Sequence, residues 1–140
     1  ATWPCRLERV LDDPPVIIDV AHNQAAMIEL ASSLQSTCAV VLAVASDKEV
    51  AGMIEAIRGL ADPLILTEFS GHRSLSANAL SHAAKDTPHE RVATLSEAIG
   101  LGLQRAASAS RPLLIIGSLF AAGEARDLLI REHDAPKLRF

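Results

Sequence analysis

The sequence predicts one α/β domain, built on a doubly wound and mostly parallel sheet with helices on both faces. Short, fully apolar segments rich in branched residues are typical of strands that are covered on both sides, and helix-like stretches alternate with them. A chain of 140 residues, 49% of them hydrophobic, is long enough to bury a single core. Successive β–α units favour right-handed crossovers, so we expect a Rossmann-like sheet of about six strands.

One of the six strands is expected to be antiparallel and to lie at the edge of the sheet. Residues 7–11 are separated from the next apolar segment by a turn-forming Asp-Asp-Pro-Pro sequence, which predicts a hairpin. The other predicted strands are residues 15–20, 39–44, 64–66, 91–95 and 113–116.

The predicted helices are a segment that begins near Gln24, residues 50–60, a segment through Ile99 and Leu103, and residues 119–131. The second of them has apolar residues at the spacing that forms one stripe on a helix. Ser46 and Glu49 are predicted to form a capping box ahead of it, and Thr94 and Glu97 a second box ahead of the third helix.

Composition excludes several classes of partner. The formal net charge is −4 and no stretch gathers Lys and Arg into a stripe, so we predict neither nucleic acid nor a membrane as a partner. No apolar run approaches the roughly 18 residues that a spanning helix needs, and no signal peptide is evident. Cys5 and Cys38 lack metal-ligand spacing and are predicted to be reduced thiols in the cytoplasm.

The ends of the chain suggest that it is part of a longer one. It begins Ala-Thr-Trp-Pro, which is typical of the middle of a structured segment, so we expect an excised domain. Residues 1–133 are predicted to form this domain, and residues 134–140, with a proline and mixed charge, a loosely held tail.

The most informative motif is Asp19-Val20-Ala21-His22-Asn23, between a predicted strand and a predicted helix. Ligands bind at the carboxyl ends of strands in open α/β sheets. Asp19 can accept hydrogen bonds from a ribose, and Arg6 on the neighbouring strand can place a cation by a ring or phosphate. An equally complete structural reading makes Asp19 the cap of the next helix. His22 and Asn23, at the N-terminus of that helix, are predicted to bind an anion.

Two further strand ends are polar. Ser46-Asp47-Lys48 follows one strand and Gly117-Ser118 another, so three polar strand ends are expected to face one crevice. The structural alternatives are that Ser118 caps a helix and that Lys48 is an exposed first-turn residue. No Ser or Cys adjacent to His22 gives it a nucleophile to activate, so we predict no catalytic residue, and the scattered histidines predict no metal site.

These motifs resemble, in order, those of the C-terminal domain of the folylpolyglutamate synthase/dihydrofolate synthase family in the Mur ligase superfamily. The segments that carry the resemblance are Trp3-Pro4-Cys5-Arg6-Leu7-Glu8, Asp19-Val20-Ala21-His22-Asn23, Ala45-Ser46-Asp47-Lys48-Glu49-Val50 and Gly117-Ser118-Leu119-Phe120. The chain departs from the family pattern at Cys5, Gln24 and His72, where Gly, Pro and Pro are usual.

The resemblance implies that Arg6 and Asp19 contact ATP. It implies that His22 and Ser118 lie beside an incoming L-glutamate, with Asn23 supporting the turn. Asp47 and Lys48 match a family motif whose role the resemblance does not assign, and Lys48 is expected to help hold either an anionic substrate or the geometry between domains. Arg73 resembles part of a Pro-Arg step in relatives and is a further candidate.

The implied function is the closing domain of an ATP-dependent amide ligase, which adds glutamate to folate or dihydropteroate through an acyl phosphate. No phosphate-binding loop or Mg²⁺-holding carboxylate set occurs in this chain, so a central domain of the same polypeptide is expected to supply both, and the chain alone is expected to be inactive. The alternatives are the C-terminal domain of another Mur-type ligase, a free-standing nucleotide- or anion-binding module and, least favoured, a small hydrolase that uses His22.

Overall fold

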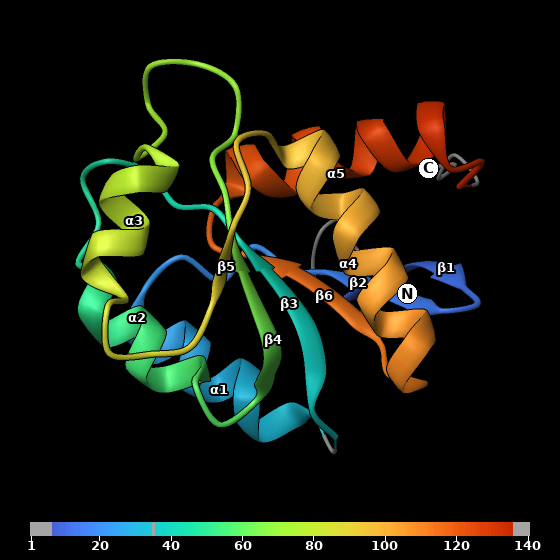
Figure 1. Cartoon of the computed structure of the whole chain (residues 1–140), viewed down its shortest axis with the longest axis horizontal. Helices are drawn as coiled ribbons and strands as arrows, with labels where there is room; N and C mark the ends of the chain where they lie inside the picture. The colour runs from blue at the N-terminus through green and yellow to red at the C-terminus, as the bar shows by residue number, and fades with distance from the viewer. Residues whose placement is uncertain (1–6, 35, 136–140) are drawn as a thin grey trace.

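A six-stranded sheet lies between two layers of helices in the computed structural model, which describes residues 7–34 and 36–135 (Figure 1). The elements in chain order are β1 (Glu8–Asp12), β2 (Pro15–Ile18), α1 (Gln24–Ser33), β3 (Cys38–Leu42), α2 (Val50–Ile57), β4 (Ala61–Leu66), α3 (Ala77–Ala83), β5 (Glu90–Arg91), α4 (Leu95–Ala109), β6 (Leu113–Ile116) and α5 (Leu119–Glu132).

The strand order is β1-β2-β6-β3-β4-β5. Strand β1 pairs with β2 in an antiparallel hairpin, whereas the pairs β2–β6, β6–β3, β3–β4 and β4–β5 are all parallel. The predicted fold class is therefore confirmed, including the antiparallel strand at the edge. Because the parallel strands share one direction, the carboxyl ends of β2, β6, β3 and β4 all reach the same edge of the sheet.

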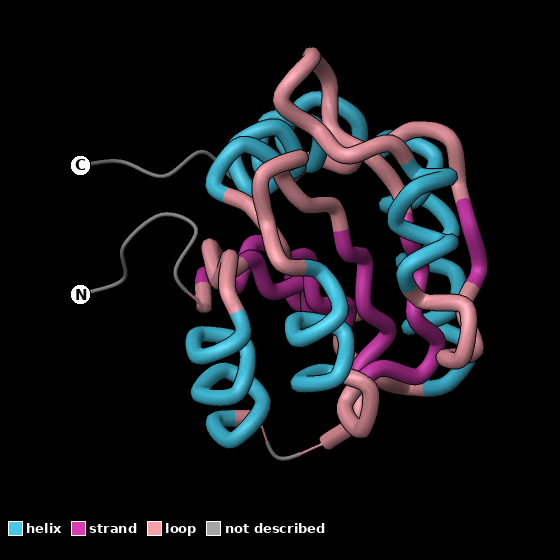
Figure 2. The backbone as a smooth tube through the Cα atoms, turned by 90° about the vertical axis from the view of Figure 1, so that its left-hand side faces the viewer, coloured by secondary structure: helices cyan, strands magenta, loops and turns pink. Residues whose placement is uncertain are grey.

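The core consists of two apolar layers, one on each face of the sheet. On one face Val41 and Ile115 pack with residues of α4 and α5, and on the other Val40 and Leu114 pack with residues of α1, α2 and α3. Figure 2 shows the strands running between the helices of the two layers. Successive side chains of a strand point to opposite faces, so fully apolar strands were needed to fill both layers.

Three local predictions need correction. The short helix α3 was not predicted: it buries only Ala77 and Leu80, and so few apolar positions form no periodic stripe. The strand predicted for residues 91–95 is β5, which ends at Arg91, because Leu95 already begins α4. The strand predicted for residues 15–20 ends at Ile18.

The two predicted capping boxes have opposite outcomes. The Thr94 hydroxyl accepts from the backbone N–H of Glu97 at 3.2 Å, so the predicted cap at Thr94 is confirmed, while the Glu97 carboxylate accepts from the Thr94 hydroxyl at 2.9 Å and not from its backbone N–H as in a full box. The box at Ser46 and Glu49 is wrong. Helix α2 begins at Val50 with Glu49 in the cap position, and the Glu49 side chain makes no capping bond. The backbone N–H of Ser46 instead donates to the carbonyl of Arg73 at 2.8 Å.

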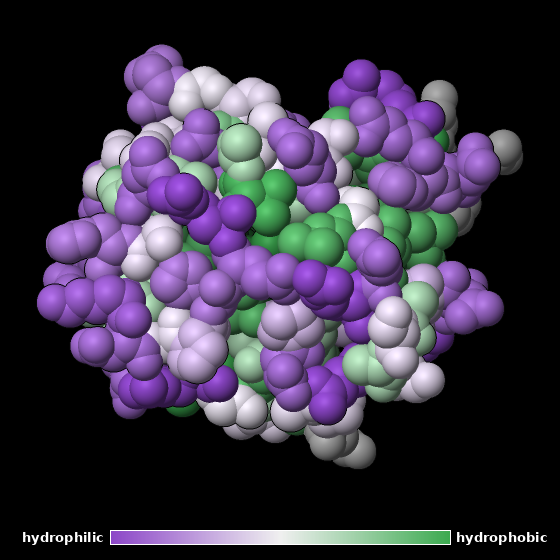
Figure 3. All heavy atoms as spheres, in the orientation of Figure 1, coloured by the Kyte–Doolittle hydropathy of each residue, from purple (hydrophilic) through white to green (hydrophobic). Residues whose placement is uncertain are grey.

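The surface is mixed in character. Figure 3 shows hydrophilic residues over most of this face and a band of hydrophobic residues beside α5. Within the part of the chain that the structure describes, none of the helices combines the length and the hydropathy needed to cross a bilayer.

The tail predicted for residues 134–140 is described only in part. Ala135 is buried and its N–H donates to the carbonyl of Leu129 at 3.0 Å, and residues 136–140 lie outside the described part.

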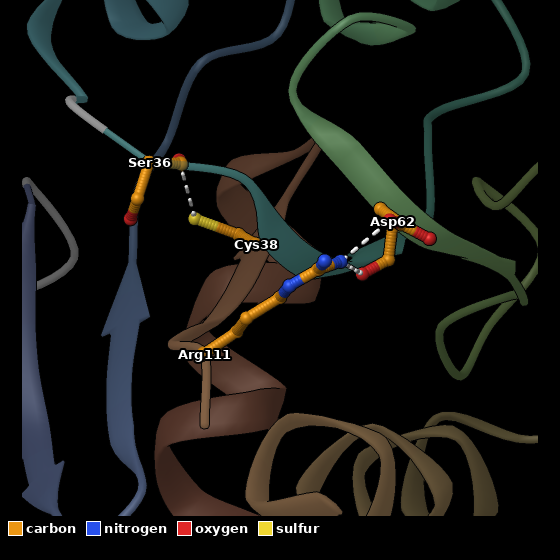
Figure 4. A network of polar contacts seen from close by, with 4 residues as sticks. All are labelled: Ser36, Cys38, Asp62 and Arg111. Atoms are coloured by element: carbon orange, nitrogen blue, oxygen red, sulfur yellow. Dashed lines mark hydrogen bonds and ion pairs between the residues drawn. The ribbon is translucent and has the colours of Figure 1, made fainter. Parts of the chain in front are cut away.

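A small polar network lies at the amino-terminal ends of β3, β4 and β6, opposite the carboxyl ends of these strands (Figure 4). Arg111, just before β6, donates to the carbonyl of Asp62 at 3.0 Å and to its carboxylate at 2.5 Å, which ties β6 to β4 across β3. Cys38 lies beside this pair with its Sγ 3.7 Å from the carbonyl oxygen of Ser36. Cys38 is a free, buried thiol, as the sequence predicts, while Cys5 lies outside the described residues.

We expect the Cys38 thiol to be protected by the fold. Burial raises the pKa of Cys38 above its usual value of 9.0, and the positive charge of Arg111 offsets this in part. Because the thiolate is the reactive form, iodoacetamide should label Cys38 at least about a hundredfold more slowly in the folded Cys5→Ser chain than in the same chain unfolded in guanidinium. Since the pKa is raised on folding, stability should be unaffected below pH 9 and should fall as the pH rises above it. Rapid labelling of the folded chain at pH 8 would contradict this.

Candidate functional site

Four loops that follow the carboxyl ends of parallel strands surround a pocket of about 400 Å³. The pocket is lined by His22, Ala45, Ser46, Asp47, Lys48, Arg73, Ser118, Leu119 and Phe120. They come from the segments after β2, β3, β4 and β6, so the sheet edge brings together residues nearly one hundred positions apart. The expectation that three polar strand ends face one crevice describes this pocket, which we call the strand-end pocket.

Asp19 organises the turn after β2. One carboxylate oxygen accepts from the N–H of Ala21 at 2.8 Å, and the other accepts from the N–H of Leu7 at 2.9 Å. The first bond is the local turn that Asp side chains favour, and the second ties this turn to the start of the hairpin. The reading of Asp19 as a helix cap is wrong, because the cap position of α1 belongs to Asn23.

His22 and Asn23 lie at the start of α1, as expected. The Asn23 side chain caps the helix by accepting from the N–H of Ala26 at 2.8 Å. His22 is exposed, and its Nδ1 is 3.0 Å from the carbonyl oxygen of Val20. A carbonyl oxygen only accepts, so Nδ1 carries the proton in this contact and Nε2 is left to meet a ligand. His22 lines the strand-end pocket, whereas Asn23 does not.

Ser118 is placed by the sharp turn between β6 and α5. Gly117 makes this turn with φ +120°, and its N–H donates to the carbonyl of Ala21 at 3.1 Å, which links the β6 end to the β2 end. Ser118 is only 3% exposed, and its hydroxyl oxygen accepts from the N–H of Phe120 at 3.0 Å. Ser118 is thus the helix cap, and it also lines the pocket at the positive end of the α5 dipole.

The charge of the pocket is predominantly positive. Lys48 and Arg73 line it together with the carboxylate of Asp47. Among residues 7–34 and 36–135, neither Lys48 nor Arg73 forms an ion pair. The Arg73 guanidinium lies 5.4 Å from the ring centre of Phe120. Two cations without carboxylate partners favour an anionic ligand.

A second hollow, of about 480 Å³, adjoins the first. Asp19 and Leu7 line it together with Glu29 and Ser33 of α1, and His22 lines both hollows. The structure therefore does not bring Asp19 and Ser118 into one pocket but places them on two sides of His22. Arg6, the other residue expected on this side, lies outside the described residues.

Sequence reasoning missed the aromatic wall of the strand-end pocket. Phe120 stacks on Phe69, with ring centres 5.8 Å apart and ring planes at 23°. Phe69 follows β4 and Phe120 is the second residue of α5, so no local pattern relates them. The available signal was an aromatic residue in the first turn of a predicted helix, and the structure leaves Phe120 49% exposed.

The site does not fit a magnesium ion by itself. In the described residues no group of three or more His, Cys, Asp or Glu side chains could hold a metal. Among the described residues, Asp47 is the one carboxylate that lines the strand-end pocket, and it is adjacent to Lys48 in the sequence. The described residues therefore do not offer the set of oxygen ligands that Mg²⁺ prefers.

Comparison with known proteins gives the family of this arrangement. The family model for the Mur ligase, glutamate ligase domain matches residues 5–119, which include every strand-end loop described above. The chain belongs to the Mur ligase glutamate ligase domain family. Within this family the chain is 32% identical to a dihydrofolate synthase/folylpolyglutamate synthase of Mycobacterium tuberculosis, over 94% of the chain and 31% of that protein. It is 27% identical to a folylpolyglutamate synthase of Lacticaseibacillus casei, over 91% of the chain and 30% of that protein.

Solved structures agree with this placement in the Mur ligase family. A Mycobacterium tuberculosis folylpolyglutamate synthase complexed with ADP and AMPPCP superposes with a TM-score of 0.85 at 31% identity, over 91% of this chain and 32% of that one. The folylpolyglutamate synthase of Thermotoga maritima matches at a TM-score of 0.80 and 24% identity, over 97% of this chain and 32% of that one, and shows the shared fold. The chain thus spans about a third of the length of these relatives.

Proposed function

We propose that this chain is the closing domain of an ATP-dependent ligase that adds L-glutamate to folate or dihydropteroate. The family supports a glutamate ligase, and the relatives named above are folylpolyglutamate or dihydrofolate synthases. The observation that carries the proposal is the strand-end pocket, where Lys48, Arg73 and the N-terminus of α5 favour a small anion.

Glutamate is the ligand that we assign to the strand-end pocket. It carries two carboxylates, which the cations Lys48 and Arg73 complement, and the Ser118 hydroxyl can donate to one of their oxygens because it otherwise acts as an acceptor. His22 offers Nε2 to the ammonium or amine group. In this proposal Asn23 acts on the ligand indirectly, by fixing the first turn of α1 behind His22.

ATP is the ligand that we assign to the second hollow. Each carboxylate oxygen of Asp19 accepts one backbone N–H and retains a second lone pair, which a ribose hydroxyl can use. Arg6 is proposed to lie on the same side. Because His22 lines both hollows, the two substrates would meet beside it.

The chemistry would proceed in two steps to which this domain contributes binding and closure. The γ-phosphoryl group of ATP passes to the carboxylate of the acceptor, which releases ADP. The amine of glutamate then attacks the carbonyl carbon, loses a proton and expels inorganic phosphate as the amide forms. The phosphate loop and Mg²⁺ are assigned to the rest of the polypeptide, and we expect the chain alone to show no turnover. Closure of this domain would keep water from the acyl phosphate.

Two substitutions that should each affect a different substrate test where ATP and glutamate bind. In the full-length enzyme Asp19→Ala should lower kcat/KM for ATP by the equivalent of about 1 to 3 kcal/mol, the scale of a hydrogen bond to a charged group. The KM for glutamate should stay nearly unchanged. His22→Ala should act mainly on glutamate. Steady-state kinetics with each substrate varied in turn measures both effects, and thermal unfolding identifies any loss that comes from the broken Leu7 tether.

An effect of His22→Ala confined to ATP would reverse the assignment of the two hollows. If the full-length enzyme formed its amide product without glutamate, or preferred a different amino acid, another Mur-type ligase would be favoured. Measurable nucleotide affinity of a chain that occurs naturally on its own would favour the free-standing binding module.

A further inference from the structure

The segment between β4 and α3, residues 67–76, contributes Arg73 to the lining of the strand-end pocket. In Figures 1 and 2 it rises above the sheet as a long loop beside the first turns of α5. Two of its backbone contacts join it to the end of β3: Ser46 donates to the carbonyl of Arg73 at 2.8 Å, and Leu75 donates to the carbonyl of Val44 at 2.8 Å. Between the buried Phe69 and the anchored Arg73, residues 70–72 make no such bond to the segment after β3 in the described structure, so their contacts with α5 bear on their position.

Helix α5 holds this part of the loop with two side chains four residues apart. Residues i and i+4 lie on the same face of a helix, so Phe120 and Glu124 are neighbours on α5. The ring of Phe120 stacks on Phe69, and Arg73 lies over the same ring. Glu124 accepts from the backbone N–H of Ser70 at 2.8 Å and from its hydroxyl at 3.1 Å.

Glu124 does not line the strand-end pocket, and each of its carboxylate oxygens accepts a hydrogen bond from Ser70. We propose that Glu124 is a positioning residue that holds loop 67–76 against α5 and thereby keeps the Arg73 guanidinium at the pocket. This inference rests on the proposed function for the role of Arg73, but the contacts of Glu124 are independent of it. A ligand that needs Arg73 binds only the fraction of molecules with the loop in place, so its apparent affinity falls with that fraction.

The test uses the full-length enzyme with Glu124→Ala, Glu124→Gln and a matched control. Glu132→Ala is the control, because Glu132 lies on the same helix and accepts from the hydroxyl of Ser96 at 2.8 Å, away from the pocket. Glu124→Ala should raise the KM for glutamate about tenfold while kcat and the KM for ATP change less than about twofold. Glu124→Gln should keep the KM for glutamate near the wild-type value, because the amide oxygen of Gln can accept from the Ser70 N–H and its amide nitrogen can donate to the Ser70 hydroxyl.

Two further measurements separate positioning from a general structural role. Amide hydrogen exchange of residues 69–74 should accelerate in Glu124→Ala and not in Glu132→Ala. In an Arg73→Ala background, Glu124→Ala should have little further effect on the KM, since residues that act through one another are not additive. An unchanged glutamate KM in Glu124→Ala, or full additivity with Arg73→Ala, would overturn the inference. If the wild-type enzyme showed no glutamate-dependent ATP turnover, the proposed function would be overturned instead. Hydrogen exchange would still test whether Phe120 and Glu124 hold residues 67–76, a set of contacts that we call the clamp.

Discussion

Gly117→Ala is expected to destabilise the chain by at least about 3 kcal/mol. The residue has φ +120°, a conformation that side chains rarely adopt. A Cβ there would lie 2.3 Å from the carbonyl oxygen of Ala43 and 2.8 Å from Cδ1 of Leu42. The carbonyl belongs to the backbone of the neighbouring strand end and cannot turn aside as a flexible side chain can. Because Ser118 is the next residue, any shift that relieves the clash also displaces the pocket wall.

Urea unfolding followed by circular dichroism measures this effect, and Gly123→Ala is the matched control. Gly123 lies inside α5, and a Cβ added there has nothing within 4 Å. That substitution should leave stability unchanged or raise it by up to about 1 kcal/mol, because alanine favours the helix. If Gly117→Ala unfolded at the same urea concentration as the wild type, the close approach of the β6 and β3 ends would be wrong.

The second large effect is expected at the ion pair between Glu8 and Arg126. Glu8 in β1 is 2% exposed, and Arg126 Nε of α5 lies 3.2 Å from its carboxylate. A second guanidinium nitrogen of Arg126 is buried and has no hydrogen-bond partner in the described structure. Glu8→Ala would leave this cation without its carboxylate partner, at a cost of about 3 kcal/mol.

A double variant separates the loss of charge pairing from the loss of packing. Glu8→Leu combined with Arg126→Met should be more stable than Glu8→Leu alone, because the second substitution removes the cation that the first leaves unpaired. Glu55→Ala is the surface comparison, since its pair with Arg58 is exposed and should contribute within about 0.5 kcal/mol. Equal losses in Glu8→Ala and Glu55→Ala, measured by urea unfolding, would show that the pair is not desolvated.

Much of the sheet could be predicted from the sequence because its strands are apolar on both faces. The segment 113–116 was placed with its observed bounds, and the hairpin partner of β2 was correctly predicted to be antiparallel. Strand ends were less certain: β2 ends at Ile18, although the backbone N–H of Asp19 still donates to the carbonyl of Ile115 in β6 at 3.1 Å. Hydropathy reports burial, and burial continues past the last paired residue.

The sequence could predict which residues belong to the candidate site, but not that they line two separate hollows. The sequence placed His22, Lys48 and Ser118 at strand ends, and the structure brings all three to one pocket. It could not show that Asp19 faces a separate hollow, since that depends on how β1 and α1 pack around the turn. The failed capping box at Ser46 has a similar cause, because its backbone N–H bonds to Arg73, a residue 27 positions away.

The sequence by itself determined the fold class, the strand-end location of the polar motifs and the turn at Gly117, because periodicity, branched residues and glycine act through local physics. Only the tertiary structure decided which loops share a wall. The clamp of Phe120 and Glu124 on residues 67–76 joins two segments about 50 positions apart through one ring stack and two hydrogen bonds. Such contacts form once the parallel sheet has brought its strand ends to one edge, and no pattern of neighbouring residues encodes them.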